Sequence, residues 1–233
     1  MHLLQTLVLG LYYYKSPSTE KAIKVVLDTV YRMDSLDGTW DDITGTGPKL
    51  TTNAEYPCSF TTFNSKVLIA NDIDIPKQYA GSGSISNMTV VTGLTQARFI
   101  DNWQNYCLMF NCVVSGVDAP TRLYWSAFKD DTSWDAADFH EFGYNDGQEI
   151  MYGKPLGGRY VIYKTKSIWV MTFTGNADIP FLVFKTNSPV GLAAPFSVQE
   201  IDNGHIFCSW DGLYYFDGLN SYKLSDKLNN TFT

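Results

Sequence analysis

Short apolar runs typical of β-strands recur five times along the chain, and a turn leads from four of them into a second apolar run. The first runs occupy residues 22–28, 65–71, 105–111, 158–164 and 203–210. When they are aligned on Ile23, Val67, Cys107, Tyr160 and Ile206, the steps between them are 44, 40, 53 and 46 residues. One four-stranded propeller blade typically spans ~40–50 residues. The repeat therefore predicts stacked blades, an architecture suited to binding or assembly.

The predicted fold is all-β, a β-propeller of about five blades that forms a single domain over residues 1–233. Its amino-terminal and carboxyl-terminal strands are expected to complete one another's blade. Equivalent buried positions in separate blades are expected at Leu68, Leu108, Val161 and Phe207. The alternatives are a propeller with a partly open ring and, if the repeat is fortuitous, a pair of β-sandwiches.

Between the repeats the pattern predicts turns and loops. Asp37-Gly38 is typical of a hairpin turn. The Gly- and Ser-rich residues 81–87 favour an exposed loop. Residues 129–141 are an insertion with five acidic side chains, which explains the longest step of the repeat.

Composition and charge narrow the possible partners. The chain carries 17 Lys and Arg against 24 Asp and Glu, a net charge of −7. Because its basic residues are dispersed, the sequence argues against nucleic-acid binding, which needs clustered Lys and Arg. The apolar run at residues 3–11 favours a buried first strand over a secretory signal, and no segment is long enough to span a membrane.

The four cysteines, Cys58, Cys107, Cys112 and Cys208, form no C-x-x-C pair. They are expected to be reduced and buried, as small hydrophobic residues of a protein that folds in a reducing cytoplasm. A zinc site is not favoured.

Candidate chemistry is sparse. The histidines are His2, His140 and His205, and the last is expected to be a hydrogen-bonded strand residue. Paired acids in an axial cleft would suit glycoside hydrolysis, and the candidates are Asp28, Asp34, Asp72, Asp101, Asp130 and Glu149. The favoured interpretation is that these acids bond backbone amides in turns. Residues 145–149 and 130–131 are weak candidates for calcium, because their spacing is not that of a helical calcium loop. No cofactor, metal or catalytic residue is predicted.

The chain contains the strings Tyr31-Arg-Met-Asp34, Asp37-Gly-Thr-Trp40, Phe60-Thr-Thr-Phe-Asn64, Arg122-Leu-Tyr-Trp-Ser126 and Asp211-Gly-Leu-Tyr-Tyr-Phe-Asp-Gly218. Together with similar strings elsewhere, they resemble tail or head–tail connector proteins of tailed bacteriophages, especially the nozzle proteins of short-tailed phages. The resemblance covers roughly residues 10–230 and consists of turns and strand cores. It implies a propeller fold and a non-enzymatic structural role in the virion, after synthesis in the bacterial cytoplasm. The implied partners are copies of the chain in a ring and other tail or connector proteins.

The candidate subunit contacts are Trp134 and Phe139 in the acidic insertion, and Tyr79 in the segment 73–89. Aromatic rings in a solvent loop are typical of a covered surface, although these rings can instead pack on their own blade. The alternative functions are a carbohydrate-binding or glycoside-hydrolase-like propeller that recognises a host glycan, and another intracellular scaffold. An assembly protein is expected to expose aromatics at its rims, and a glycan-binding protein to gather them in a pocket.

Overall fold

The computed structural model describes residues 7–15, 20–34, 38–47, 49–51, 55 and 57–225. Within these residues every regular element is a β-strand, and the strands form five four-stranded antiparallel sheets. The chain separates into two compact units. The first contains the residues up to Ala119 together with Leu123–His140, and the second contains Pro120–Arg122 and the residues from Glu141 onward.

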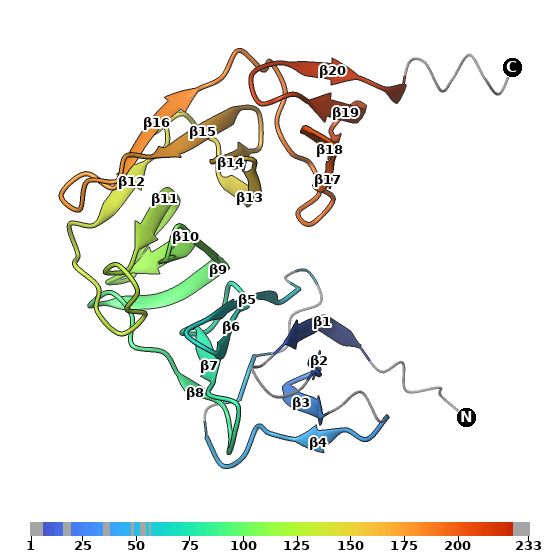
Figure 1. The fold of residues 1–233 in the computed structure, drawn as a ribbon, viewed down its shortest axis with the longest axis vertical. Helices are drawn as coiled ribbons and strands as arrows, with labels where there is room; N and C mark the ends of the chain where they lie inside the picture. Colours follow the sequence, from blue (N-terminus) through green and yellow to red (C-terminus); the bar gives the residue numbers. More distant parts are fainter. Residues whose placement is uncertain are drawn as a thin grey trace, which may run out of the picture. The chain divides into compact units, whose positions relative to one another are not determined.

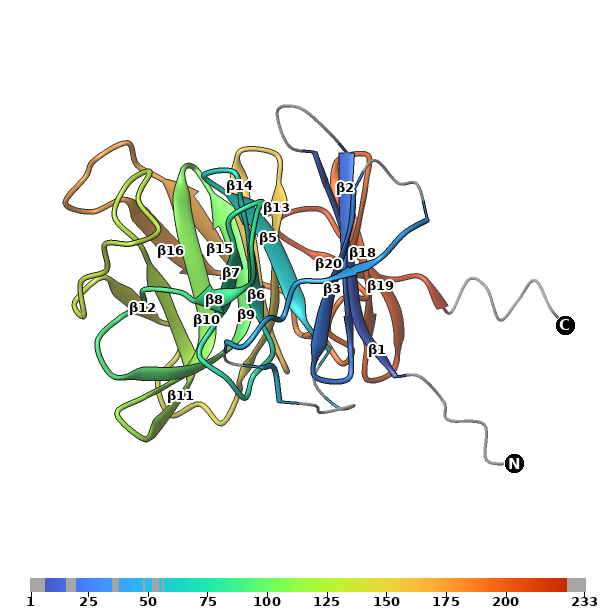
Figure 2. The same ribbon diagram turned by 90° about the horizontal axis from the view of Figure 1, so that it is seen from below.

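The first unit holds the first two sheets and most of the third. The strands of the first sheet are β1 (Val8–Lys15), β2 (Glu20–Val26), β3 (Thr29–Asp34) and β4 (Asp41–Asp42). Those of the second are β5 (Ser59–Phe63), β6 (Lys66–Ala70), β7 (Lys77–Tyr79) and β8 (Ser86–Asn87). Those of the third are β9 (Leu94–Trp103), β10 (Tyr106–Val114), β11 (Val117–Trp125) and β12 (Phe139–Glu141). In Figure 2, β1, β2 and β3 run side by side, as their antiparallel register requires.

The second unit holds the fourth and fifth sheets. The strands of the fourth are β13 (Ile150–Leu156), β14 (Arg159–Lys164), β15 (Ile168–Phe173) and β16 (Phe181–Lys185). Those of the fifth are β17 (Gln199–Ile201), β18 (Gly204–Ser209), β19 (Gly212–Phe216) and β20 (Ser221–Lys223). Each sheet follows the order of its strands in the chain, so β13 and β16 are the two edges of the fourth sheet (Figure 1).

The predicted repeat is confirmed by the place of its strands. Leu68, Leu108, Val161 and Phe207 lie in β6, β10, β14 and β18, the second strand of each sheet, and each is fully buried. The second strand is an inner strand of its sheet, and most of its residues are buried. This is why its apolar run is the clearest signal in every repeat.

Polar residues in the left-handed backbone region form the tight turns of the first unit. The turn between β5 and β6 has φ of 48° at Asn64 and 62° at Ser65, and the turn between β9 and β10 has 51° at Gln104 and 62° at Asn105. Two successive residues with positive φ are typical of the hairpin turn whose twist matches that of the flanking strands.

The hydrophobic core consists of clusters between neighbouring sheets. In the first unit, Ile23 and Val25 belong to one cluster with Val67 and Ile69. In the second unit, the Tyr163 ring lies 5.1 Å from that of Phe207, between the fourth and fifth sheets. Burial of such side chains contributes roughly 1.5–3 kcal/mol each.

The cysteines agree with the prediction in three cases out of four. All are free, and Cys58, Cys107 and Cys112 are buried, whereas Cys208 is partly exposed. Burial, with a smaller contribution from Asp74, raises the pKa of the Cys58 thiol to about 12. Burial also raises the pKa of Cys107 well above its ordinary value. Both side chains are therefore protonated, unreactive thiols at neutral pH.

Several local expectations are corrected. The terminal strands do not complete one another's blade, because the first and last sheets each consist of four consecutive strands. The expected loop at residues 81–87 ends in β8, and the acidic insertion ends in β12. Strands of two or three residues show no alternation in the sequence, so pattern alone does not predict them. Asp37 of the expected hairpin turn lies outside the described residues, and the single domain stays a prediction.

Candidate functional site

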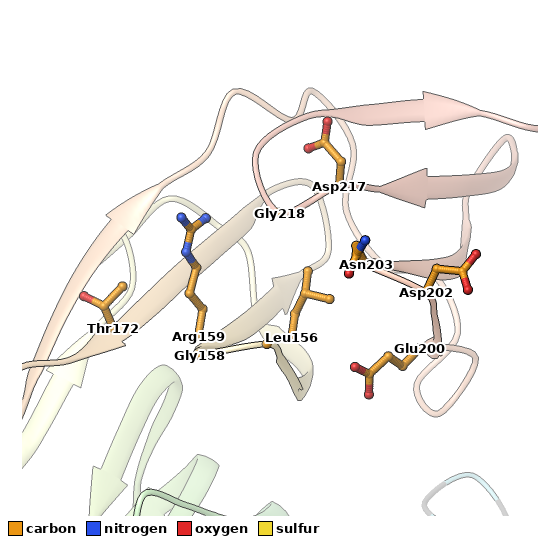
Figure 3. A pocket seen from close by; sticks show the side chains of 10 residues that line it. Leu156, Gly158, Arg159, Thr172, Glu200, Asp202, Asn203, Asp217 and Gly218 are labelled. Atoms are coloured by element: carbon orange, nitrogen blue, oxygen red, sulfur yellow. The ribbon is translucent and has the colours of Figure 1, made fainter.

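The candidate site is a cavity of about 470 Å³ in the second unit, between the fourth and fifth sheets. This volume is within the range of small-molecule sites. Three turns surround it: Gly157-Gly158 between β13 and β14, Asp202-Asn203 between β17 and β18, and Asp217-Gly218 after β19. Leu156, Arg159, Thr172 and Glu200 complete its lining (Figure 3).

Arg159 supplies the positive charge of the cavity. It is the first residue of β14 and pairs with Leu156 on one side and with Thr172 on the other, so these three side chains are held by one sheet. A Cβ atom placed on Gly218 would lie 3.7 Å from Arg159 Nη1 and 3.7 Å from Leu156 Cδ2. An added methyl group at this position would therefore be in ordinary van der Waals contact with both side chains.

The carboxylates of Glu200, Asp202 and Asp217 line the cavity. Asp217 forms hydrogen bonds within its own loop. Its Oδ1 accepts hydrogen bonds from the amides of Leu219 (2.8 Å) and Asn220 (2.7 Å), and its Oδ2 accepts one from the Tyr222 hydroxyl (3.0 Å). Burial acts to raise the pKa of Asp217, but these hydrogen bonds outweigh it and the pKa is lowered. Asp217 is thus an ionised turn residue.

The remaining groups suit recognition better than catalysis. In Figure 3 the carboxylate of Asp202 points away from Arg159, and Asn203 stands between Asp202 and Leu156. The lining contains no histidine, cysteine or aromatic ring. Within the described residues no group of three or more His, Cys, Asp or Glu side chains is arranged to hold a metal ion. The cavity can hydrogen-bond a small polar group, but its lining includes no nucleophile beside a base.

The six carboxylates considered from the sequence do not meet in this cavity, since none of them lines it. They take part in local structure instead. Asp28 pairs with Lys49 at 2.9 Å, and Asp34 pairs with Arg32 at 3.0 Å. Asp101 accepts a hydrogen bond from the amide of Asn102, and Asp130 accepts one from the amide of Thr132. The interpretation as a turn residue is confirmed for Asp130, whereas Asp101 lies within β9.

The two calcium candidates contain carboxylates that bind the protein's own lysines. Lys164 Nζ lies 2.8 and 2.7 Å from the two carboxylate oxygens of Asp146, and Lys66 Nζ lies 2.7 Å from Asp131 Oδ2. These carboxylates anchor loops to strands.

His205 is a fully buried, hydrogen-bonded strand residue, as predicted. Its Nε2 lies 2.9 Å from the carbonyl oxygen of Pro155, and its Nδ1 lies 2.9 Å from the Tyr163 hydroxyl. The carbonyl can only accept, so Nε2 carries the proton and Nδ1 accepts from Tyr163. Burial lowers the pKa of His205, although the bond to Pro155 acts in the opposite direction.

Of the predicted contact residues, Trp134 and Phe139 are partly exposed, whereas Tyr79 is fully buried. Trp134 and Phe139 are half-buried against the core between the second and third sheets. The Trp134 Nε1 donates to the carbonyl of Asp131 at 2.9 Å, and the Phe139 ring lies 5.5 Å from that of Tyr124. Packing on their own blade is therefore the arrangement in this structure. Whether a subunit also covers them stays a prediction.

Tyr79 is fully buried, and its hydroxyl accepts a hydrogen bond of 2.8 Å from the Arg32 guanidinium. No part of its ring is available to a neighbouring subunit. Tyr79 stands in β7, the third strand of its sheet, and joins the core between the first and second sheets. A subunit contact through Tyr79 requires an exposed ring, which this position does not provide.

Sequence reasoning did not identify the cavity. The signal was present in the dipeptides Gly157-Gly158, Asp202-Asn203 and Asp217-Gly218, which are typical of turns. Nothing in their spacing shows that these three turns meet.

No protein-family model matches the chain, and no curated protein matches it either. Solved structures do resemble it. The designed protein Ika8 has a TM-score of 0.55 at 12% identity, over 93% of this chain and 60% of that chain. BamB from Moraxella catarrhalis has 0.54 at 11% identity, over 91% of this chain and 62% of that chain. The WD40 β-propeller domain of Doa1 has 0.52 at 12% identity, over 94% and 70%.

These similarities, together with five four-stranded sheets, define the chain as a protein of the β-propeller fold. The chain spans less than two thirds of the Ika8 and BamB chains. At such low identity the resemblance extends to the fold alone.

Proposed function

We propose that the protein is a non-catalytic structural component of a tailed-bacteriophage virion, in the tail or the head–tail nozzle. The observation that supports an assembly role best is the location of exposed apolar side chains. Phe173, Leu182 and Phe184 are exposed on the two outer strands of the fourth sheet, and Ile179 is exposed just before β16. Apolar side chains gathered on an outer edge are typical of a surface that another chain covers.

The position of the aromatic side chains disfavours the glycan-binding alternative, which predicts that they gather in a pocket. Sugar-binding pockets commonly present aromatic faces, and the cavity lining has none. A glycoside hydrolase needs two free carboxylates across the scissile bond. Of the three carboxylates that line this cavity, Asp217 is held by its own loop, so only Glu200 and Asp202 are left to form such a pair.

In this proposal the rigid sheets act as a spacer, and exposed surfaces contact copies of the chain in a ring and other tail or connector proteins. The place of action is the virion, after synthesis in the cytoplasm of the bacterial host. The phage assignment is supported by the sequence resemblance described above. The net charge of −7 suits a protein of a crowded assembly that does not bind nucleic acid.

The direct test is to locate the protein in purified particles of the phage that encodes it. Mass spectrometry of the particles and antibody labelling in the electron microscope should place it at the tail or the connector. Its absence from particles would exclude the proposal. A glycan array with the purified chain tests the alternative, and specific binding to a host glycan would favour that function instead.

The predicted contact of Trp134 and Phe139 is tested in the same particles by changing both to Ser. Because both rings also pack on their own blade, this variant loses stability as well. A matched control is Met88→Ala, which removes packing from the same core cluster but not from the insertion. We expect the double variant to be incorporated less than the control at equal folded concentration. Equal incorporation would mean that this insertion is not the contact.

A further inference from the structure

The last strand of each sheet in chain order, β4, β8, β12, β16 or β20, is its outer strand. Among these five strands, β16 differs from the others in length and composition. Four of them are short and include polar or charged residues: Asp41–Asp42, Ser86–Asn87, Phe139–Glu141 and Ser221–Lys223. β16 has five residues, and the first four, Phe-Leu-Val-Phe, are apolar. Natural proteins keep edge strands short, charged or irregular because a long apolar edge pairs with other chains. In the described structure β16 has none of these protections except Lys185 at its end.

The register shows which backbone groups of β16 face outward. Thr186 donates its amide to the carbonyl of Ile168, and Thr174 donates to that of Pro180. Hydrogen-bonded pairs in an antiparallel ladder alternate, so Leu182 and Phe184 bond to β15. The amide and carbonyl groups of Val183 and Lys185 therefore point away from the sheet. The pairing of β15 with β16 has no irregularity along its five residues.

The side chains around this edge are unusually exposed for apolar groups. Leu182 is 59% exposed and Ile179 is 57% exposed, while Phe184 and Phe173 are 39% and 36% exposed. Leu182 and Phe184 lie on one face of the edge, and Phe173 lies on the other face beside Phe181, so both faces of this edge carry exposed apolar groups next to outward-facing backbone groups. A strand added at this position would gain hydrogen bonds and cover apolar surface at once.

We propose that a second copy of this chain pairs antiparallel with β16, with Val183 opposite Val183. The strand is complementary to itself in this register. Leu182 lies opposite Phe184 of the copy on the exposed face of the strand, and Lys185 lies opposite the buried Phe181 on the other face. Leu beside Phe is a favourable cross-strand pair.

The charges agree with an antiparallel partner of the same sequence. The segment before β16 carries Asp178, and the strand ends in Lys185. Antiparallel pairing brings the acidic end of one copy toward the basic end of the other, whereas parallel pairing would align like charges. The contact is two-fold and closes on itself. It therefore joins two chains and adds to the ring contacts proposed above without replacing them.

The inference rests on the proposed assembly role for its use in the particle, but its test needs only the purified chain. Val183→Pro removes an outward-facing N–H and leaves the hydrogen bonds of Leu182 and Phe184 to β15 intact, since proline is tolerated on the solvent side of an edge strand. Val183→Thr is the matched control, because it keeps the N–H and the strand propensity.

The measurement is sedimentation equilibrium over a wide range of concentration. We expect the mass of the unchanged chain and of the Thr variant to rise from one chain to two, and the Pro variant to remain a single chain. A thermal unfolding transition like that of the unchanged chain would establish that the Pro variant is folded. A chain that stays single at every concentration, or a Pro variant that pairs as well as the unchanged chain, would overturn the proposal.

A crosslinking experiment tests the register and does not depend on proline. In a chain carrying Cys208→Ser, Val183→Cys places two thiols across the axis. Opposed Cα atoms in a hydrogen-bonded pair are about 5.5 Å apart, which a disulfide spans. Leu182→Cys is the control, because its counterpart lies opposite Phe184. Rapid crosslinking of Val183→Cys alone supports the register, and equal or slower crosslinking than at Leu182→Cys refutes it.

The failures of the two proposals can be told apart. A protein that is found in particles but does not pair through β16 keeps the proposed function and refutes this contact. A chain that pairs through β16 but is absent from particles supports this contact and refutes the proposed function. Pairing of β16 with an apolar peptide from another protein, while the chain itself stays single, also refutes a second copy as the occupant.

Discussion

The ammonium group of Lys164 is fully buried and lies 2.7 Å from a carboxylate oxygen of Asp146. Lys164 ends β14, and Asp146 belongs to the loop before β13. The same ammonium donates to the carbonyl of Phe142. Burial lowers the pKa of Lys164, while Asp146 acts to raise it. One lysine thus ties a nine-residue segment, residues 141–149, to the middle of the fourth sheet.

We expect Asp146→Asn to lower the free energy of unfolding by about 3 kcal/mol, because it leaves a buried ammonium without its carboxylate. Denaturant unfolding measures the change. Adding Lys164→Met to this variant should restore part of the loss, since it removes the unpaired charge. Asp178→Asn, at an exposed loop position, is the control and should unfold like the parent. If Asp146→Asn unfolds like the parent as well, the ion pair does not anchor the loop.

His205 should make the protein less stable in acid. Its folded-state pKa lies below the ordinary value of 6.5 because of burial, so the unfolded chain binds its proton more readily. Its contribution is therefore fully present above pH 6.5 and decreases as the pH falls through 6.5 toward the folded-state pKa.

The measurement is the free energy of unfolding at pH 7.5 and pH 5, for the parent and for His205→Gln. We expect the parent to lose more stability than the variant between these two values. An identical loss in both proteins would show that His205 does not titrate in this range.

The two glycines of the cavity turn should respond differently to alanine. Gly157 has a φ of 57°, and Gly158 is outside the left-handed region, while a Cβ on either would meet open space. Gly157→Ala should therefore cost about 1–2 kcal/mol through backbone strain, and Gly158→Ala should be close to neutral. Thermal or denaturant unfolding of the pair separates strain from packing, because neither variant creates a clash. Equal costs would contradict the assigned backbone conformation.

Thiol labelling of the native protein should modify one cysteine quickly and three slowly. Cys208 is partly exposed, whereas the other three are buried, and burial raises the thiol pKa of Cys58 and Cys107. A colorimetric thiol assay counts the groups before and after denaturation. Cys208→Ser should abolish the fast phase, and persistence of that phase would mean that a buried cysteine becomes accessible.

Much of the fold was predictable because strongly buried strands appear in the sequence as short runs of apolar residues. The runs around Leu68, Leu108, Val161 and Phe207 are mostly apolar and mostly buried, and they recur at the length of a blade. The interpretation of His205 succeeded for a related reason, since a lone histidine inside an apolar strand needs local hydrogen-bond partners.

The outer strands were not predictable in the same way. β4, β8 and β12 have two or three residues each, too few for a period, and their pairing uses backbone groups that nearly every residue has. The burial of Tyr79 was not predictable for the same reason. Its strand, β7, has only three residues and follows Pro76.

The class of fold, the repeat length and the buried strand of each blade could be predicted because they depend on local patterns of apolar residues. The tertiary structure decided which turns meet, that Trp134 and Phe139 pack on their own blade, and that the terminal strands belong to separate sheets. It also decided that β16 presents an apolar edge. These features arise from contacts between residues far apart in the chain, and such contacts leave no period that a sequence displays.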